Sequence, residues 1–120
     1  MKKDTLQEFC QISGIDWFST LDRFMNNENL YEKILFKFPA DPSFPELKKK
    51  IAEGDVQASF MYAHTLKGVA GNLGLAHLFH LASLLTDELR NGHIENAPHL
   101  MKDLNEQYEA ICDFIMKIQN

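Results

Sequence analysis

The spacing of apolar residues along the chain predicts helices throughout. Apolar residues recur three or four positions apart, which is the period of one face of an α-helix, and no stretch sustains the alternation of apolar and polar residues typical of a strand. Glycine, asparagine and proline residues separate these stretches at places where helices commonly begin or end. We therefore expect an all-α fold.

Capping signals divide the beginning of the chain into short helices. Thr5 with Glu8 matches a capping box that opens a first helix, which Gly14 ends, and Asp16 caps a second helix that runs to about Asn26. The aromatic residues of this segment are expected to be core residues: Trp17, Phe18 and Phe24.

Two further helices are expected before the middle of the chain. Asn27 can cap a helix that continues to Phe38, where a proline-rich segment interrupts it. Ser43 with Glu46 forms another capping-box pattern, and the helix that it opens ends before Gly54.

Three longer helices fill the rest of the chain. Asp55 caps the first and Gly74 ends it, the second continues to Asn91, and the third starts near Asn96. The tight loop at Gly74 predicts that the first two form an antiparallel hairpin. The third has apolar residues at alternating spacings of three and four, as in the seam of a bundle: Leu100, Leu104, Tyr108, Ile111, Ile115 and Ile118.

These elements predict an antiparallel four-helix bundle in a single domain of 120 residues. Residues 1–26 supply short additional N-terminal helices packed across one end, and residues 27–120 supply the bundle. A chain of this length can bury a core but leaves no room for a second catalytic domain.

One expected helix has reactive side chains on its outward face. On an α-helix, residues three, four and seven positions from His64 share its stripe: Gln57, Phe60, Lys67, Gly68 and Gly71. The opposite stripe is mostly apolar and is expected to be buried against neighbouring helices: Ser59, Tyr62, Ala63, Leu66, Val69, Ala70 and Leu73. His64 is therefore expected to face solvent or a partner.

The two glycines on this stripe indicate a docking surface. Glycine inside a helix costs about 1 kcal/mol relative to alanine, so Gly68 and Gly71 need a reason, and close approach by a partner supplies one. The alternative is that they relieve crowding against a neighbouring helix. Phe60 and the adjacent Met61 could add an apolar platform for the partner, although the N-terminal helices could instead cover Phe60.

His64 and Lys67 together suit phosphoryl transfer. A histidine in water titrates near pH 6.5, so at neutral pH most of it is neutral, with a lone pair on one ring nitrogen that can attack phosphorus. The transition state spreads negative charge over three oxygens, which a nearby cation stabilises. Lys67, one helical turn away, can supply that charge.

The run His64-Thr65-Leu66-Lys67-Gly68, followed by Gly71 and by Asn72-Leu73-Gly74, resembles the motif of the histidine-containing phosphotransfer (HPt) family. That motif reads His-x-Leu-Lys-Gly, then small residues, then Asn-x-Gly. The resemblance extends upstream through Gly14-Ile15-Asp16 and through residues 30–38. Val69 departs from the small polar residue of many members, and its place on the buried stripe favours a packing role.

The resemblance implies an intermediate of a phosphorelay. His64 would be the phosphorylated residue, Lys67 the electrostatic helper, and Gly68 and Gly71 the clearance for the incoming active site. The implied partners are receiver domains of response regulators or a hybrid histidine kinase. The chain itself would need no cofactor, because Mg²⁺ sits in the acidic pocket of the receiver.

Composition excludes several other functions. The formal charge of −5 argues against nucleic-acid binding. The single basic run, Lys48-Lys49-Lys50, is expected to be a solvated helix end that interacts favourably with the helix dipole, and the alternative is contact with the acidic rim of a receiver. No Gly-rich phosphate loop is present, so we expect no autokinase activity. The resemblance implies a stoichiometric phosphocarrier rather than an enzyme. No apolar stretch is long enough to span a membrane, and we expect a cytoplasmic protein.

The remaining cysteines and histidines favour structural or solvent-exposed roles. Cys10 and Cys112 lie too far apart in sequence to form a metal motif and are expected to be reduced packing thiols. His77 and His80 have a metal-compatible spacing but lack carboxylate partners, so we expect no metal site. Two others, His93 and His99, are expected to lie in solvent.

Two competing functions stay open. A non-catalytic binding module could sequester a receiver or a histidine kinase without carrying phosphate, and it would tolerate loss of the imidazole of His64. The dimerising phosphoacceptor domain of a histidine kinase would need a kinase domain elsewhere and would assemble its bundle from two chains. This chain has helices enough for its own bundle, so we expect a monomer.

Overall fold

The computed structural model describes residues 1–119, and these residues are helical without a strand. The elements follow in this order: α1 (Lys3–Ser13), α2 (Trp17–Arg23), α3 (Glu28–Leu35), the short 3₁₀ helix η1 (Phe38–Ala40), α4 (Ser43–Glu53), α5 (Val56–Leu73), α6 (Ala76–Arg90), a second 3₁₀ helix η2 (Ile94–Asn96) and α7 (Ala97–Gln119). The all-α prediction is confirmed.

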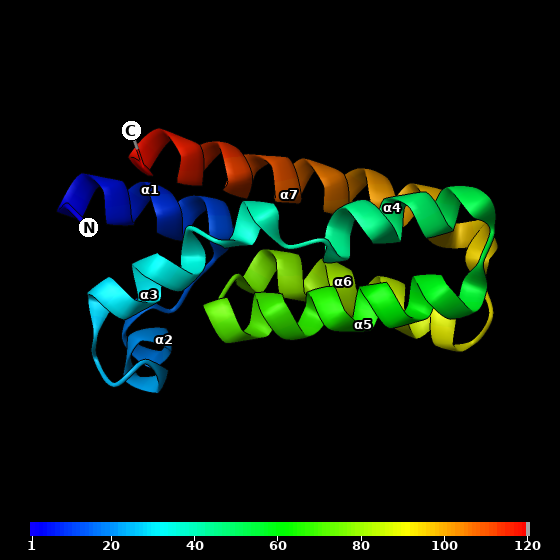
Figure 1. Ribbon diagram of the computed structural model, residues 1–120, viewed down its shortest axis with the longest axis horizontal. Coiled ribbons are helices and arrows are strands. Elements are labelled where there is room, and N and C mark those ends of the chain that lie inside the picture. The colour runs from blue at the N-terminus through cyan, green and yellow to red at the C-terminus, as the bar shows by residue number, and fades with distance from the viewer. Residues whose placement is uncertain (120) are drawn as a thin grey trace.

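Helices α4 to α7 form the expected bundle (Figure 1), with α5 packed between α4 and α6, and with α6 also against α7. The α5–α6 hairpin is antiparallel, as predicted from the tight loop. Helices α2 and α3 lie at the end of the bundle where this loop is, so the bundle itself starts with α4 rather than at residue 27 as expected. The first helix, α1, differs from the prediction, because it runs along the C-terminal half of α7 rather than across the end.

The position of α1 follows from the length of α7. At 23 residues α7 is longer than α5 and α6, so its C-terminal half extends past them and needs its own cover. Phe9 of α1 supplies it by stacking on Phe114 of α7, with ring centroids 5.0 Å apart. Both rings are buried, so α1 extends the core beyond the bundle.

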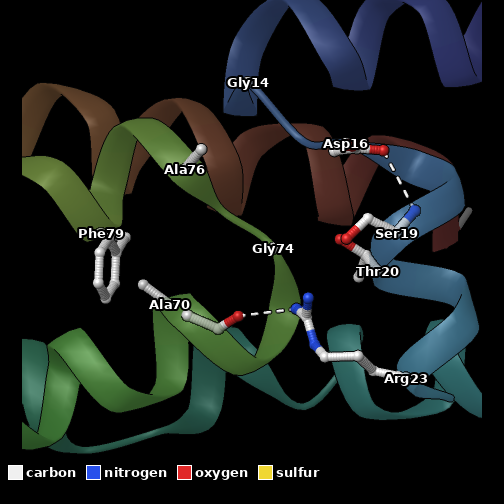
Figure 2. A pocket seen from close by; sticks show the side chains of 10 residues that line it. Gly14, Asp16, Ser19, Thr20, Arg23, Ala70, Gly74, Ala76 and Phe79 are labelled. Carbon is white, nitrogen blue, oxygen red and sulfur yellow. Dashed lines mark hydrogen bonds between the residues drawn. The ribbon is translucent and has the colours of Figure 1, made fainter.

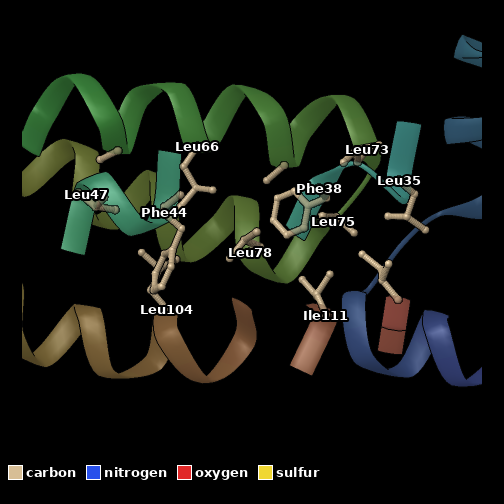
Figure 3. Packing of buried hydrophobic residues seen from close by; sticks show 14 of the residues in the cluster. Leu35, Phe38, Phe44, Leu47, Leu66, Leu73, Leu75, Leu78, Leu104 and Ile111 are labelled. Atoms are coloured by element: carbon tan, nitrogen blue, oxygen red, sulfur yellow. The ribbon is translucent and has the colours of Figure 1, made fainter. Parts of the chain in front are cut away.

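The core is a continuous apolar cluster between the bundle helices (Figure 3). Every bundle helix contributes fully or nearly fully buried residues to it, among them Phe44, Leu47, Leu66, Leu73, Leu78, Leu85, Leu104 and Ile111. Burying one such side chain stabilises the fold by about 1.5–3 kcal/mol. The core therefore fixes which face of α5 points inward.

Three of the predicted helix caps are confirmed. The side chains of Asp16, Asn27 and Asp55 accept hydrogen bonds from the backbone N–H three residues later, at 3.0–3.1 Å, at the starts of α2, α3 and α5. Gly14, Gly54 and Gly74 end their helices with φ of 72–73°, the left-handed conformation that glycine adopts without strain. These signals place both ends of α5 as expected.

The two capping boxes are wrong. The first helix starts at Lys3, ahead of Thr5, and the residue at its N-cap position makes no side-chain cap bond. Ser43 is the first residue of α4 rather than its cap, and the Asp41 carboxylate accepts from the Ser43 backbone N–H at 2.9 Å. The first helix thus begins two residues before its predicted cap residue, and α4 begins at its predicted cap residue itself.

Two helix ends and one core residue also differ from the prediction. The second helix ends at Arg23, because Met25 and Asn26 adopt positive φ. Helix α3 ends at Leu35, three residues before Phe38, and a turn at residues 36–37 leads into η1. Phe18 is 84% exposed, because α2 is short and buries only Thr20 completely. The other two aromatic residues, Trp17 and Phe24, are partly buried, edge-on to the ring of Tyr31.

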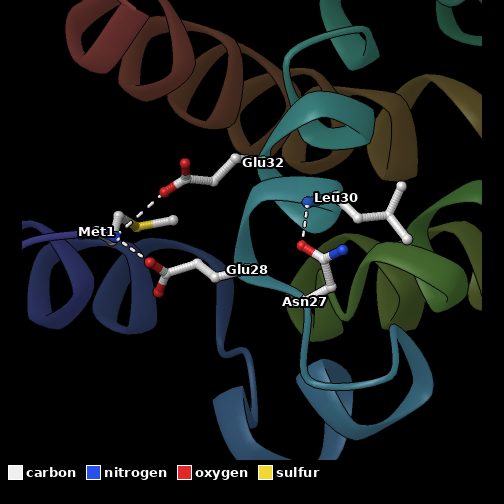
Figure 4. A network of polar contacts seen from close by, with 5 residues as sticks. All are labelled: Met1, Asn27, Glu28, Leu30 and Glu32. Atoms are coloured by element: carbon white, nitrogen blue, oxygen red, sulfur yellow. Dashed lines mark hydrogen bonds and ion pairs between the residues drawn. The ribbon is translucent and has the colours of Figure 1, made fainter.

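Ion pairs join Met1, which precedes α1, to α3 (Figure 4). The Met1 ammonium lies 2.8 Å from Glu28 Oε2 and 3.2 Å from Glu32 Oε1. The carboxylates are partly exposed, so each pair contributes little to stability. Within residues 1–119, every helix is too short or too polar to cross a bilayer.

Candidate functional site

Helix α5 holds His64 at the surface of the bundle. His64 lies in the middle of this 18-residue helix and is exposed, as predicted. The opposite face is anchored by Ala63, Leu66 and Ala70, which are all buried. This burial prevents α5 from rotating, so the imidazole stays directed away from the core.

The ring of His64 stacks beside Phe60, one turn earlier on α5. The ring centroids are 6.1 Å apart and the planes differ by 14°, which is an offset parallel arrangement. Arg90 of α6 lies over the Phe60 ring, with its Cζ 5.5 Å from the centroid, and its Nη1 is 2.7 Å from Asp87 Oδ1. Phe60 is thus partly buried, and the side chain that lies over its ring comes from α6 rather than from the N-terminal helices.

Lys67 lies one turn after His64 and has an aromatic neighbour on α6. Its ammonium is 5.6 Å from the centroid of the Phe79 ring, within the range of a cation–π contact. Among residues 1–119, no carboxylate lies within ion-pair distance of this ammonium. The positive charge of Lys67 is therefore not neutralised by an ion pair in this part of the chain.

The two glycines of the outward stripe have different surroundings. A Cβ added to Gly68 would meet no atom within 4 Å, whereas a Cβ on Gly71 would lie 3.3 Å from Cδ2 of Phe79. Glycine at position 71 thus makes room for the Phe79 ring. At this position the structure therefore supports the alternative that the glycine relieves crowding against a neighbouring helix. At Gly68 no neighbour explains the missing side chain, and docking stays the prediction there.

A shallow cavity of about 300 Å³ continues from Gly71 toward α2. Figure 2 shows Phe79 and Arg23 at opposite sides of it. Arg23 Nη2 donates to the carbonyl oxygens of Gly71 at 2.9 Å and Asn72 at 3.3 Å. A cation at these last carbonyls caps α5 and complements the helix dipole.

The other predicted docking residues lie on the same side of α5 as His64. Gln57 is exposed, and Met61 is 62% exposed. Gln57 and Phe60 line a second open cavity, of about 310 Å³, together with Arg90 and Gly92. The structure thus brings the predicted stripe together on one surface, and what binds there stays a prediction.

The remaining histidines make local contacts. His77, His80, His93 and His99 are all exposed, as expected. Two of them also have a polar neighbour: His77 Nδ1 is 3.1 Å from the Ile12 carbonyl oxygen, and His93 Nδ1 is 3.3 Å from Glu88 Oε2. Within residues 1–119 no group of three or more His, Cys, Asp or Glu side chains could hold a metal ion.

Both cysteines are free and half-buried in the structure. Burial raises the pKa of the Cys112 thiol, which disfavours the reactive thiolate. Both cysteines pack against the apolar core, as expected of packing thiols.

Sequence reasoning missed the residues that α6 and α2 place around this surface. Phe79 and Arg90 lie on α6, and Arg23 lies on α2. The signal that could have found the first two is the register of the α5–α6 hairpin, which sets Gly71 against Phe79 near the turn and Phe60 against Arg90 farther along. No local motif marks any of these residues.

Comparison with known proteins supports one family. The sequence model described as Hpt domain matches residues 35–114, which contain His64 and the whole α4–α6 segment. The match starts at the last residue of α3, so the N-terminal helices lie almost entirely outside it. Comparison with curated proteins finds no match. Comparison with solved structures finds none either.

Proposed function

Since the chain belongs to the Hpt domain family, and is therefore a histidine phosphotransfer module of two-component systems, we propose that His64 carries a phosphoryl group between the aspartates of two receiver domains. The observation that most supports this is the exposed imidazole in the middle of α5, inside the matched region. Members of the family are phosphocarriers rather than catalytic domains.

The accepting step is an attack by His64 on an aspartyl phosphate of the first receiver. The lone pair of one ring nitrogen forms the N–P bond, and the P–O bond to the aspartate breaks, so that the carboxylate leaves with the electron pair. In the second step a carboxylate of the other receiver attacks phosphorus. The N–P bond then breaks and the imidazole recovers its electron pair.

Lys67 stabilises the charge that develops on the phosphoryl oxygens. The transition state is loose and places negative charge on three oxygens, and a fixed cation lowers its free energy. Because the Lys67 ammonium rests on an aromatic ring rather than on a carboxylate, its full charge acts on the phosphoryl group. We assign the Mg²⁺ that completes this charge balance to the acidic pocket of the receiver.

The same proposal includes three finer statements. The chain does not phosphorylate itself from ATP, and incubation with Mg²⁺-ATP alone is expected to leave His64 unmodified. It acts as a monomer, which sedimentation tests. It works in the cytoplasm, docking receivers through the surface formed by Gln57, Phe60, Met61 and Gly68, and Gly71 borders this surface where it leaves room for the Phe79 ring.

The binding module that sequesters a receiver is the second candidate, and His64→Gln separates the two. Glutamine keeps a polar side chain of similar reach but offers no nucleophilic ring nitrogen. Purified receiver domains of the source organism, each phosphorylated with a small acyl phosphate, serve as donors. Transfer to the wild-type chain and to the variant is followed together with binding and helix content.

We expect His64→Gln to bind the same receiver with similar affinity but to accept no phosphate. A variant that still accepts label would contradict the assignment of His64. A wild-type chain that binds receivers but takes phosphate from none of them would favour the binding module. Unchanged helix content in the variant excludes unfolding as the cause.

A further inference from the structure

Phe79 lies on α6, outside the phosphotransfer motif, yet it contacts the cation of that motif. The ring lies beside α5 at two places: the Lys67 ammonium is 5.6 Å from its centroid, and the ring edge occupies the space that a side chain at position 71 would need. Lys67 and Gly71 are four residues apart and share a face of α5. The ring therefore spans one turn of the reactive face.

Gly71 is the reason that the ring can take this position. A Cβ at residue 71 would lie 3.3 Å from Cδ2 and 3.4 Å from Cε2 of Phe79, which is closer than side chains normally pack. A residue without a side chain leaves that space to the phenyl ring. The packing of α5 against α6 at Gly71 thus determines where the Phe79 ring lies.

A lysine on a helix surface is ordinarily mobile or paired with an acid. An acidic partner would fix Lys67 but would cancel the charge that a phosphoryl group needs. The face of an aromatic ring attracts an ammonium through its quadrupole without neutralising it. Phe79 keeps 39% of its surface exposed, so the ring and the ammonium on it are open to an incoming partner.

We propose that Phe79 is a positioning residue for phosphoryl transfer, which holds the Lys67 ammonium beside His64 with its charge intact. This inference rests on the proposed function of His64 and Lys67. It assigns Phe79 a role through Lys67 rather than in the folding core or in direct contact with the reacting atoms.

The test compares Phe79→Leu with Phe79→Tyr, because leucine keeps apolar bulk and removes the aromatic face, whereas tyrosine keeps the face. Each change is made in the wild-type chain and in Lys67→Ala, which gives a double-mutant cycle. The measured quantities are the transfer rate from a phosphorylated receiver, receiver affinity, thermal unfolding and the NMR shifts of the Lys67 Cε methylene protons.

We expect Phe79→Leu to slow transfer about two- to fivefold, the size expected for loosening one exposed cation–ring contact. Phe79→Tyr should transfer at nearly the wild-type rate. In the Lys67→Ala background Phe79→Leu should have no further effect, because the cation that the ring positions is gone. The ring-current shift of the Lys67 protons should disappear in Phe79→Leu and persist in Phe79→Tyr.

An equal slowing by Phe79→Leu with and without Lys67 would overturn the inference, and so would a loss of receiver affinity that accounts for the whole effect. Unchanged Lys67 proton shifts in Phe79→Leu would also overturn it. These outcomes leave the role of His64 standing, because that role fails only if His64→Gln still accepts phosphate. The two proposals can therefore fail separately.

Discussion

The two faces of α5 divide stability from chemistry. The inward face carries Ala63, Leu66 and Ala70, which are buried and pack in the core. The outward face carries His64, which is exposed, and Gly68, which has open space beside it. Because few core contacts depend on the outward face, its residues can serve transfer at little cost to the fold, and each face should respond to substitution in its own way.

The surroundings of the outward face differ from one position to the next. On the side of α6, aromatic rings and cations lie against it, with Arg90 over Phe60 and Lys67 over Phe79. At Gly68 nothing occupies the space that a side chain would fill. The contacts with α6 suit the positioning of the Lys67 charge, and the open space at Gly68 suits the approach of a partner.

Leu66→Ala tests the inward face and should have the largest effect on stability. Leu66 is 1% exposed, and shortening it leaves a cavity, so we expect the free energy of unfolding to fall by about 2–5 kcal/mol. Urea unfolding measures this loss. Under conditions where the variant remains folded, transfer should proceed at close to the wild-type rate. A loss well below 1 kcal/mol would mean that this face is not the anchor of α5.

Lys67→Ala tests the outward face and should show the opposite pattern. Loss of one charge-stabilising group slows transfer about ten- to a thousandfold. The free energy of unfolding should change by no more than about 0.5 kcal/mol, since the residue lies at the surface. Rapid-quench transfer kinetics give the rate, with Lys67→Arg as the variant that keeps the charge. An unchanged rate in Lys67→Ala would remove this residue from the mechanism.

Gly68→Ala tests whether the open position serves docking. Alanine favours the helix by about 1 kcal/mol over glycine, and no atom of the chain opposes the new methyl group, so thermal stability should rise. Receiver affinity should fall, because the methyl group occupies the space for the partner. Titration calorimetry with a receiver domain checks this, and unchanged affinity would show that Gly68 provides no clearance.

Gly71→Ala is the matched control and should raise stability less than Gly68→Ala does. The same gain in helix propensity is partly offset, because the Cβ meets the Phe79 ring at 3.3 Å and the ring must shift by a few tenths of an ångström. Thermal unfolding of the two variants side by side measures the difference. A larger gain for Gly71→Ala than for Gly68→Ala would contradict the packing that we describe around Phe79.

The sequence predicted the fold and the reactive face because both depend on local signals. Asp16, Asn27 and Asp55 cap helices through their own backbone neighbourhood, and glycine ends helices through its own φ. The exposure of His64 follows from the period of α5 alone. These features need no knowledge of how distant segments pack.

The features that were missed or wrong depend on packing between elements. Phe79 and Arg90 reach the His64 surface only through the register of the α5–α6 hairpin, which capping residues and apolar period do not specify. Phe18 is apolar like its neighbours, but the short α2 has no helix to cover it. The capping boxes at Thr5 and Ser43 failed because each helix begins earlier than the pattern indicates.

The most direct test of the central claim is to locate the phosphoryl group on the chain. The wild-type protein is incubated with a phosphorylated receiver, kept at alkaline pH to preserve the acid-labile N–P bond, digested, and sequenced by tandem mass spectrometry. We predict phosphate on His64 and none on His77, His80, His93 or His99. Phosphate on another residue would contradict the assignment of His64. So would a chain that carries no phosphate after a receiver that binds to it has lost its phosphoryl group.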